Sequence, residues 1–132
     1  MKGNMLESNS NTVLAAKITD ALPRFSGTEH WYRHSLNRRM TFTDGVKYLA
    51  DAAGAYWLVD EIALRQIKPA VRAQEFQVWK LAKNKSGNGA TLTMEDGNKH
   101  VCHTARIPFT DFPLPEVTLW FADNVILLPS EY

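Results

Sequence analysis

Four residues of metal-ligating types stand in two places along the sequence. His30 and His34 lie in the segment TEHWYRHSLNRR (28–39), and on a helix this spacing would place both imidazoles on one face, as in many zinc sites. His100 and Cys102 are two apart, so on a strand they would share a face as well. The helical motif HExxH is absent, because aromatic and basic residues separate the two histidines. A metal site built from these four residues is therefore a minor alternative, and no metal is assigned.

Cys102 is the single cysteine of the chain, and His103 follows it directly. A thiol beside an imidazole is the combination that cysteine nucleophiles use. Neighbours on a strand point to opposite faces, however, so Cys102 would need His30 or His34 to fold over it. The glycine patterns of serine hydrolases, P-loops and dinucleotide-binding folds are also missing. We therefore favour a protein that is not an enzyme, assign no catalytic residue or cofactor, and keep a metal- or cysteine-dependent enzyme as an alternative.

The segment 28–39 is also rich in the residue types that dominate protein interfaces. Tryptophan, tyrosine and arginine are enriched at interface hot spots, and a guanidinium group grips carboxylates through two parallel hydrogen bonds. We therefore predict a surface that binds an unknown protein partner, formed by Trp31, Tyr32, Arg33, His34, Arg38 and Arg39. Arginine with stacking aromatic rings also suits single-stranded nucleic acid, which is the second alternative.

Charge and hydropathy limit the classes of partner. A net charge of +1 excludes a strongly basic nucleic-acid-binding protein on composition alone. Residues 62–106 hold eight Lys and Arg against three acidic residues, whereas residues 107–132 hold four acidic residues and no Lys or Arg. No apolar run reaches the roughly 18 residues that span a bilayer, and the N-terminus lacks a signal-peptide pattern. We expect a cytoplasmic protein without a membrane partner.

The elements that would position these residues follow from the apolar period, which is helical up to about residue 68 and alternating after residue 74. We expect helices at 12–22, 44–54 and 55–68, a short helix near 31–37, and a short strand at 40–43. Pro23 and Pro69 are expected to end the first and third of the longer helices. Further strands are expected at 76–83, 90–94, 100–107, 117–122 and 125–128, with two-residue turns at Asp96-Gly97 and Asp123-Asn124.

Helices followed by strands indicate an α+β fold. The N-terminal helices would pack on one face of a four- to five-stranded, mainly antiparallel meander sheet. A parallel βαβ arrangement is disfavoured, because the connections between the strands are too short to hold a crossover helix. We expect one domain over residues 11–132 and a disordered N-terminus over residues 1–10.

Several segments, in this order along the chain, carry a resemblance to a known family: FSGTEHWYRH (25–34), TDGVKYLADAAGAYWLVDEIA (43–63), EFQVWKL (75–81), LTMEDGN (92–98), TDFPLP (110–115) and VILLPSEY (125–132). Together they resemble a domain of unknown function found in small uncharacterised bacterial proteins. Such proteins are often carried by plasmids, prophages and other mobile elements. The resemblance implies one domain from about residue 20 onward. It implies no activity or site residue, and it favours an accessory protein that binds a host or element-encoded partner.

Overall fold

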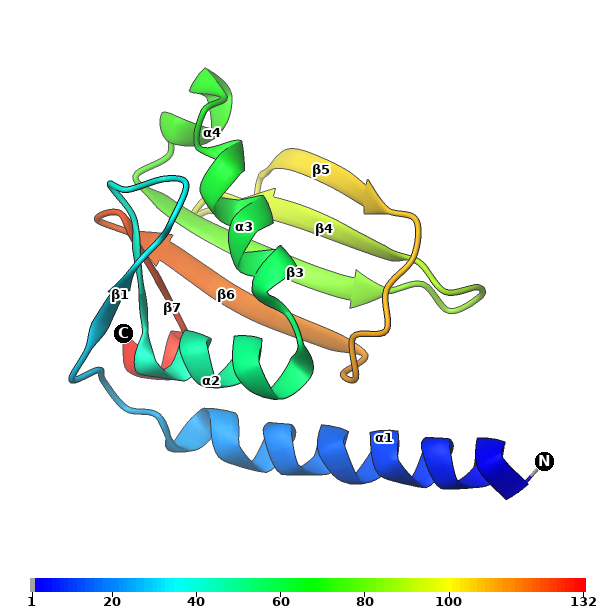
Figure 1. The fold of residues 1–132 in the computed structure, drawn as a ribbon. Helices are drawn as coiled ribbons and strands as arrows, with labels where there is room; N and C mark the ends of the chain where they lie inside the picture. The colour runs from blue at the N-terminus through cyan, green and yellow to red at the C-terminus, as the bar shows by residue number, and fades with distance from the viewer. Residues whose placement is uncertain (1) are drawn as a thin grey trace.

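A seven-stranded sheet and four α-helices form residues 2–132, the part of the chain that the computed structural model describes, with side chains described from residue 11 onward (Figure 1). The helices are α1 (Lys2–Ala21), α2 (Asp44–Ala53), α3 (Tyr56–Arg65) and α4 (Pro69–Arg72). The strands are β1 (Trp31–Arg33), β2 (Thr41–Thr43), β3 (Phe76–Lys83), β4 (Ala90–Glu95), β5 (Val101–Ile107), β6 (Glu116–Ala122) and β7 (Val125–Leu127). Two 3-10 turns, η1 (Leu22–Arg24) and η2 (Pro129–Glu131), follow α1 and β7. The predicted α+β class is confirmed.

The strand order is β1-β2-β7-β6-β3-β4-β5, and every neighbouring pair is antiparallel except β2 and β7. The predicted meander of four to five strands is therefore wrong in strand number and in layout. Strand β1 has three residues, which is too short to show an alternating pattern, whereas the short strand expected at 40–43 is observed as β2. After β5 the chain returns to place β6 beside β3. Strand β7, near the end of the chain, then pairs in parallel with β2, which lies more than 80 residues earlier in the sequence.

Three local predictions also need correction. The turn predicted at Asp96-Gly97 is longer than two residues, because the backbone of Asp96 bonds that of His100 and the positive φ, 69°, lies at Lys99. The expected short helix near 31–37 is instead strand β1 followed by an irregular loop, because Tyr32 pairs with Phe42 of β2. The third helix ends at Arg65 rather than at residue 68, and Pro69 occupies the first turn of α4. Proline suits a helix start, since its missing N–H would have no intrahelical partner there.

The boundaries of α2 and the predicted turn between β6 and β7 follow from local chemistry. Thr43 is the N-cap of α2, and its hydroxyl accepts a hydrogen bond from the backbone N–H of Val46 at 3.3 Å. Gly54 ends the helix with a φ of 61°, a left-handed conformation that glycine adopts without strain. Asp123 and Asn124 have φ values of 52° and 62°, as a two-residue turn between antiparallel strands requires.

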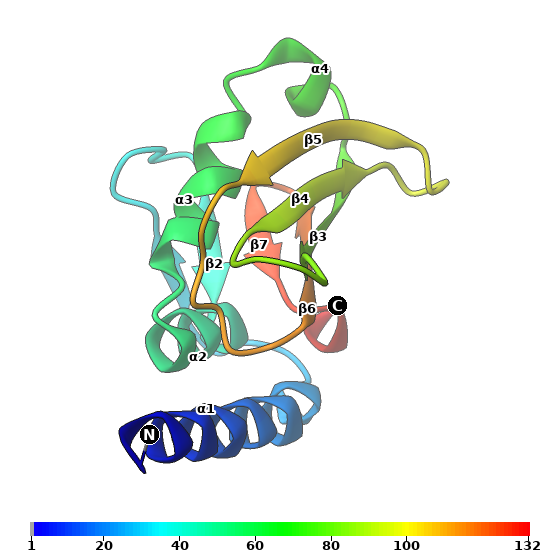
Figure 2. The ribbon, with the colours of Figure 1, turned by 90° about the vertical axis from the view of Figure 1, so that its right-hand side faces the viewer.

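The hydrophobic core lies between the sheet and the two central helices (Figure 2). Alternate residues of β3, β4 and β6 are buried on this face, and Trp79 is the largest of them at 1% exposure. Val46, Leu58 and Ile62 of α2 and α3 are equally buried. Ile18 anchors α1 with 0% exposure, while Val13 on the same helix is 66% exposed. Helices therefore cover one face of the sheet, and the opposite face carries the more polar alternate residues.

The predicted disorder of residues 1–10 concerns a segment that lies outside the residues described in full. None of the helices in the described part of the chain combines the length and the apolar character needed to cross a bilayer.

Candidate binding surface

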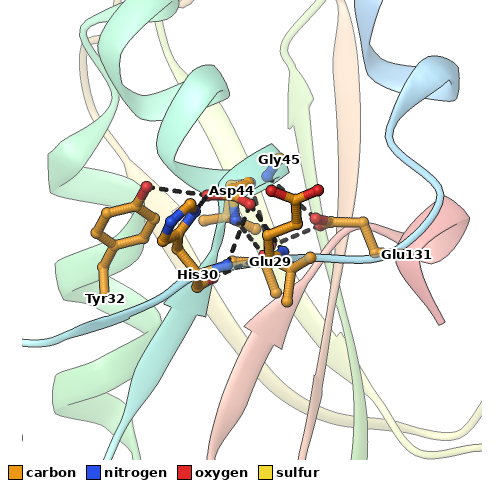
Figure 3. A network of polar contacts seen from close by, with 9 residues as sticks. Glu29, His30, Tyr32, Asp44, Gly45 and Glu131 are labelled. Atoms are coloured by element: carbon orange, nitrogen blue, oxygen red, sulfur yellow. Dashed lines mark hydrogen bonds and ion pairs between the residues drawn. The ribbon is translucent and has the colours of Figure 1, made fainter.

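The first half of the segment 28–39 is held against the start of α2 by the carboxylate of Asp44 (Figure 3). This carboxylate accepts hydrogen bonds from the backbone N–H groups of Glu29 at 2.9 Å and His30 at 3.2 Å, and from the hydroxyl of Tyr32 at 2.9 Å. The bond from Glu29 is the main reason why the pKa of Asp44 falls from 3.8 to about 2. The same network raises the pKa of Tyr32, chiefly through its hydrogen bond to Asp44. The hydroxyl of Tyr32 is therefore engaged within the molecule.

A second carboxylate reaches the same helix end from the far end of the chain (Figure 3). Glu131 accepts hydrogen bonds from the hydroxyl of Thr43 at 2.6 Å, the backbone N–H of Gly45 at 3.1 Å and that of Leu128 at 2.9 Å. Backbone N–H groups and the helix dipole both favour a negative charge at this position. Sequence reasoning missed this contact, because nothing in the local pattern links residues that are 86 positions apart.

His34 lies beneath the surface and organises the loop between β1 and β2. It is 3% exposed, and its Nδ1 accepts the backbone N–H groups of Leu36 at 3.1 Å and Asn37 at 3.0 Å. Since Nδ1 accepts, Nε2 carries the hydrogen and donates a hydrogen bond to the Asp60 carboxylate at 2.7 Å. Both ring nitrogens are thus occupied. His34 fixes the loop that carries the arginines and does not face solvent.

The remaining residues of the predicted surface are accessible. Trp31 is 58% exposed, and Arg33, Arg38 and Arg39 are exposed as well. Arg33 donates a hydrogen bond from Nη1 to the backbone carbonyl of Arg38, so the end of β1 lies beside the loop. The guanidinium groups of Arg38 and Arg39 have no ionic partner among the residues that the structure describes. Neither Glu29 nor Asp44 neutralises them.

Arg38 and Arg39 line a solvent-open cavity of about 870 Å³. Its walls are the loop after β1, the end of α3 with α4, and the turn between β6 and β7. Arg72 adds a third guanidinium group from α4, while Leu36 and Ile67 are apolar lining residues that are 68% and 72% exposed. Two carboxylates, Glu75 and Asp123, also line the cavity, and within the described chain neither forms an ion pair. The cavity therefore presents unpaired charges of both signs, with cations in excess, next to exposed apolar side chains.

The residues weighed for metal binding and catalysis are not brought together. His30 and His34 flank β1, while His100 and Cys102 lie at β5, the opposite edge of the sheet. Three of them have their own neighbouring carboxylate: Asp44 for His30, Asp60 for His34 and Asp96 for His100. The thiol of Cys102 donates to the backbone carbonyl of His100 at 3.4 Å. Among the described residues, no group of three or more metal-ligating side chains could hold an ion.

His103 differs from these residues because its Nε2 is buried without a hydrogen-bond partner in the described structure. Its ring lies 6.0 Å from that of Trp79, between centroids, on the core side of β5. Burial lowers the pKa of His103, and the nearby positive charges of Lys68 and Arg65 lower it further. A neutral imidazole packed against the core accounts for this environment.

Comparison with known proteins gives one match. A family of unknown function, DUF6876, matches residues 16–132, which include every residue of the candidate surface. No curated protein and no solved structure matches the chain. Since the match covers nearly the whole sequence, from the second half of α1 to the end, this chain belongs to the DUF6876 family of unknown function.

Proposed function

We propose that the chain is a non-enzymatic binding module that takes an acidic segment of another protein. One observation carries this proposal: Arg38, Arg39 and Arg72 line one open cavity with no ionic partner among the described residues. A hydrogen bond to a charged group contributes roughly 1.5–3 kcal/mol, whereas micromolar binding requires about 8 kcal/mol, so the arginines supply part of the binding free energy and the apolar lining supplies the rest. The side chains of these three arginines form no hydrogen bond or ion pair with the described residues, so we expect their substitution to leave the fold intact.

The apolar and acidic lining residues indicate which kind of anion fits. Leu36 and Ile67 offer exposed aliphatic surface, and burying one such side chain contributes roughly 1.5–3 kcal/mol. Glu75 and Asp123 would repel a polymer that carries a phosphate at every residue. A protein segment that alternates acidic and apolar residues meets both conditions. Single-stranded nucleic acid matches the arginines and the exposed Trp31, but it does not match the two carboxylates.

A cytoplasmic location and a role as an accessory protein of a plasmid or phage complete the proposal. The family resemblance supports the accessory role, since proteins of this kind are often carried by mobile elements. The partner would then be a protein of the host or of the element itself.

Selection from a random peptide display library, with this protein as bait, tests the binding function directly. We expect enriched peptides that combine Asp and Glu with aliphatic or aromatic residues. Their affinity, measured by fluorescence anisotropy, should decrease as the salt concentration is raised from about 50 to 200 mM. Arg38→Ala, Arg39→Ala and Arg72→Ala should each weaken binding about tenfold or more.

Arg106→Ala is the matched control. Arg106 is exposed on β5, so this substitution removes the same charge at the opposite edge of the sheet. This variant should bind as the wild type does. The proposal fails if no acidic peptide is enriched, or if the arginine variants at the cavity bind as well as Arg106→Ala. A mixed-sequence single-stranded oligonucleotide that binds more tightly than the peptides would move the function to nucleic acid.

A further inference from the structure

Strand β1 forms an edge of the sheet, and its outer side is open in the described structure (Figure 1). The hydrogen bond from the backbone N–H of His34 to the carbonyl of Met40, at 2.9 Å, fixes which residues of β1 face inward. His34 and Met40 continue the register of Trp31 with Thr43 and Tyr32 with Phe42. In an antiparallel pair, residues alternate between bonding the neighbouring strand and facing away from it.

This alternation assigns the outward positions. His34 bonds β2, so Tyr32 bonds β2 as well, while Trp31 and Arg33 turn their N–H and C=O groups away from the sheet. The backbone N–H of His30 agrees with this pattern, since it is held on the inner side by Asp44 at 3.2 Å. Two donors and two acceptors therefore line the open edge. Unpaired backbone groups of this kind are a template for pairing with another chain.

The open edge leads directly to the arginines of the candidate binding surface. The side chains of Trp31 and Arg33 share one face of β1, because side chains alternate along a strand. Arg33 contacts the carbonyl of Arg38, which places the last residue of the edge beside the loop that lines the cavity. A chain that runs along β1 and passes Arg33 would therefore reach Arg38 and Arg39.

We propose that the acidic segment binds in an extended conformation, as an eighth strand on β1, and continues from Arg33 toward the cavity. This inference rests on the proposed function and adds the conformation and position of the partner. Backbone hydrogen bonds to Trp31 and Arg33 hold the segment, and its side chains provide selectivity, as in other cases of strand addition. Its acidic residues lie beside Arg33 rather than beside Trp31, because Glu29 precedes that end of the strand.

A second copy of this chain is a poorer occupant of the same edge. Two β1 strands paired about a two-fold axis at Tyr32 would place Arg33 of each copy opposite Trp31 of the other, and the residues before Trp31 are held against their own Asp44, so a second copy would not continue toward the cavity. The other edge strand, β5, is longer, but its pairing with β4 is interrupted by an irregularity between Met94 and Glu95. Such bulges twist an edge away from further pairing.

Amide hydrogen exchange followed by NMR tests the added strand, with an acidic peptide from the display selection as the probe. On saturation with peptide, the amides of Trp31 and Arg33 should exchange at least about tenfold more slowly. The amide of Tyr32, already bonded to β2, should change little, and amides of β5 should not change. N-methylation of successive peptide residues should weaken binding about tenfold at every second position only, because alternate N–H groups face β1.

The outcomes separate this inference from the proposed function. Peptide binding that depends on Arg38, with unchanged exchange at Trp31 and Arg33, overturns the added strand and leaves the binding function standing. Absence of any selected acidic peptide rejects both. Protection of Trp31 and Arg33 that appears without peptide and rises with protein concentration assigns the edge to a second copy and also overturns the inference.

Discussion

At the residue scale, Asp44 shows how one carboxylate joins a loop, a strand and a helix. It accepts hydrogen bonds from Glu29, His30 and Tyr32, and its pKa is lowered from 3.8 to about 2. A carboxylate with a lowered pKa in the folded state stabilises the fold above its unfolded pKa. That stabilisation is lost as the pH falls from about 4 through about 2.

Asp44→Asn should therefore lower the free energy of unfolding at pH 7 and make it less sensitive to pH between about 5 and 2. Urea midpoints at several pH values in this range measure both effects. Asp111→Asn is the control, since Asp111 is exposed on the loop before β6 and the structure gives its side chain no hydrogen bond. If the wild type and Asp44→Asn lose stability in parallel on acidification, the carboxylate does not carry this role.

His34 is a second single residue with a structural role, because its ring determines the path of the loop between β1 and β2, which carries Arg38 and Arg39. His34→Ala leaves the backbone N–H groups of Leu36 and Asn37 without their acceptor, so it should lower the free energy of unfolding by about 1–3 kcal/mol. It should also weaken peptide binding, although it removes no contact with the peptide. Asp60→Asn should be milder, since an amide oxygen can still accept from Nε2.

Thermal unfolding and anisotropy titrations of these variants provide the two measurements. His100→Ala, at a side chain that is 78% exposed, is the control and should match the wild type in both. Unchanged binding by His34→Ala would mean that the loop keeps its shape without the ring. The arginines would then be positioned by other contacts.

At the element scale, the start of α2 is where the two ends of the fold meet. A Cβ atom on Gly45 would lie 2.5 Å from Cδ1 of Leu128 and 2.7 Å from Oε1 of Glu131. Both atoms end flexible side chains, but Leu128 is 2% exposed and Glu131 is held by hydrogen bonds. Gly45→Ala should therefore cost about 1–3 kcal/mol, although alanine is the better helix former.

Gly97→Ala provides the matched comparison for this prediction. Its added Cβ would approach nothing closer than 3.7 Å, at Cδ1 of Phe76, so the change should stay within about 0.5 kcal/mol. Chemical denaturation of both variants distinguishes the two sites. A stable Gly45→Ala protein would show that η2 moves away from α2 at little cost.

Element length explains how much of the fold could be predicted from sequence. Helix α2 and strand β3 are long enough to show their periods, and the Thr43 cap and the Asp123-Asn124 turn follow from local chemistry. Strand β1 has three residues, and its conformation depends on pairing with β2 and on Asp44. Such segments carry no period of their own, so their structure is determined by contacts that are distant in sequence.

The candidate site was predicted in part for the same reason. Arg38 and Arg39 are adjacent in the sequence, and the type of residue alone indicated a binding surface. Arg72 and Asp123 reach the cavity only because α4 and the turn after β6 pack beside that loop. The burial of His34 depends in turn on Asp60 of α3. Residue type can thus indicate a surface, but it cannot assign which distant side chains complete it.

At the scale of the whole molecule, the parallel pairing of β2 with β7 joins the two halves of the chain. Ile126 of β7 is 0% exposed and pairs with Phe42 of β2 and Phe121 of β6. One contiguous cluster of buried residues runs from Ile18 to Leu128 across the helices and the sheet. We therefore predict that residues 11–132 unfold as one cooperative domain.

Ile126→Ala tests this prediction, because it removes a buried side chain where the two halves meet. It should cost about 2–5 kcal/mol, and Ile67→Ala, at a side chain that is 72% exposed, should change stability by less than about 0.5 kcal/mol. In a Trp31→Phe background, tryptophan fluorescence reports on α3, β3 and β6, which hold Trp57, Trp79 and Trp120, whereas far-UV circular dichroism reports on all helices and strands. Both transitions in urea should shift together. If Ile126→Ala shifts the dichroism transition and leaves the fluorescence transition in place, β1, β2 and α2 unfold separately from the rest of the sheet, and the chain is not one cooperative unit.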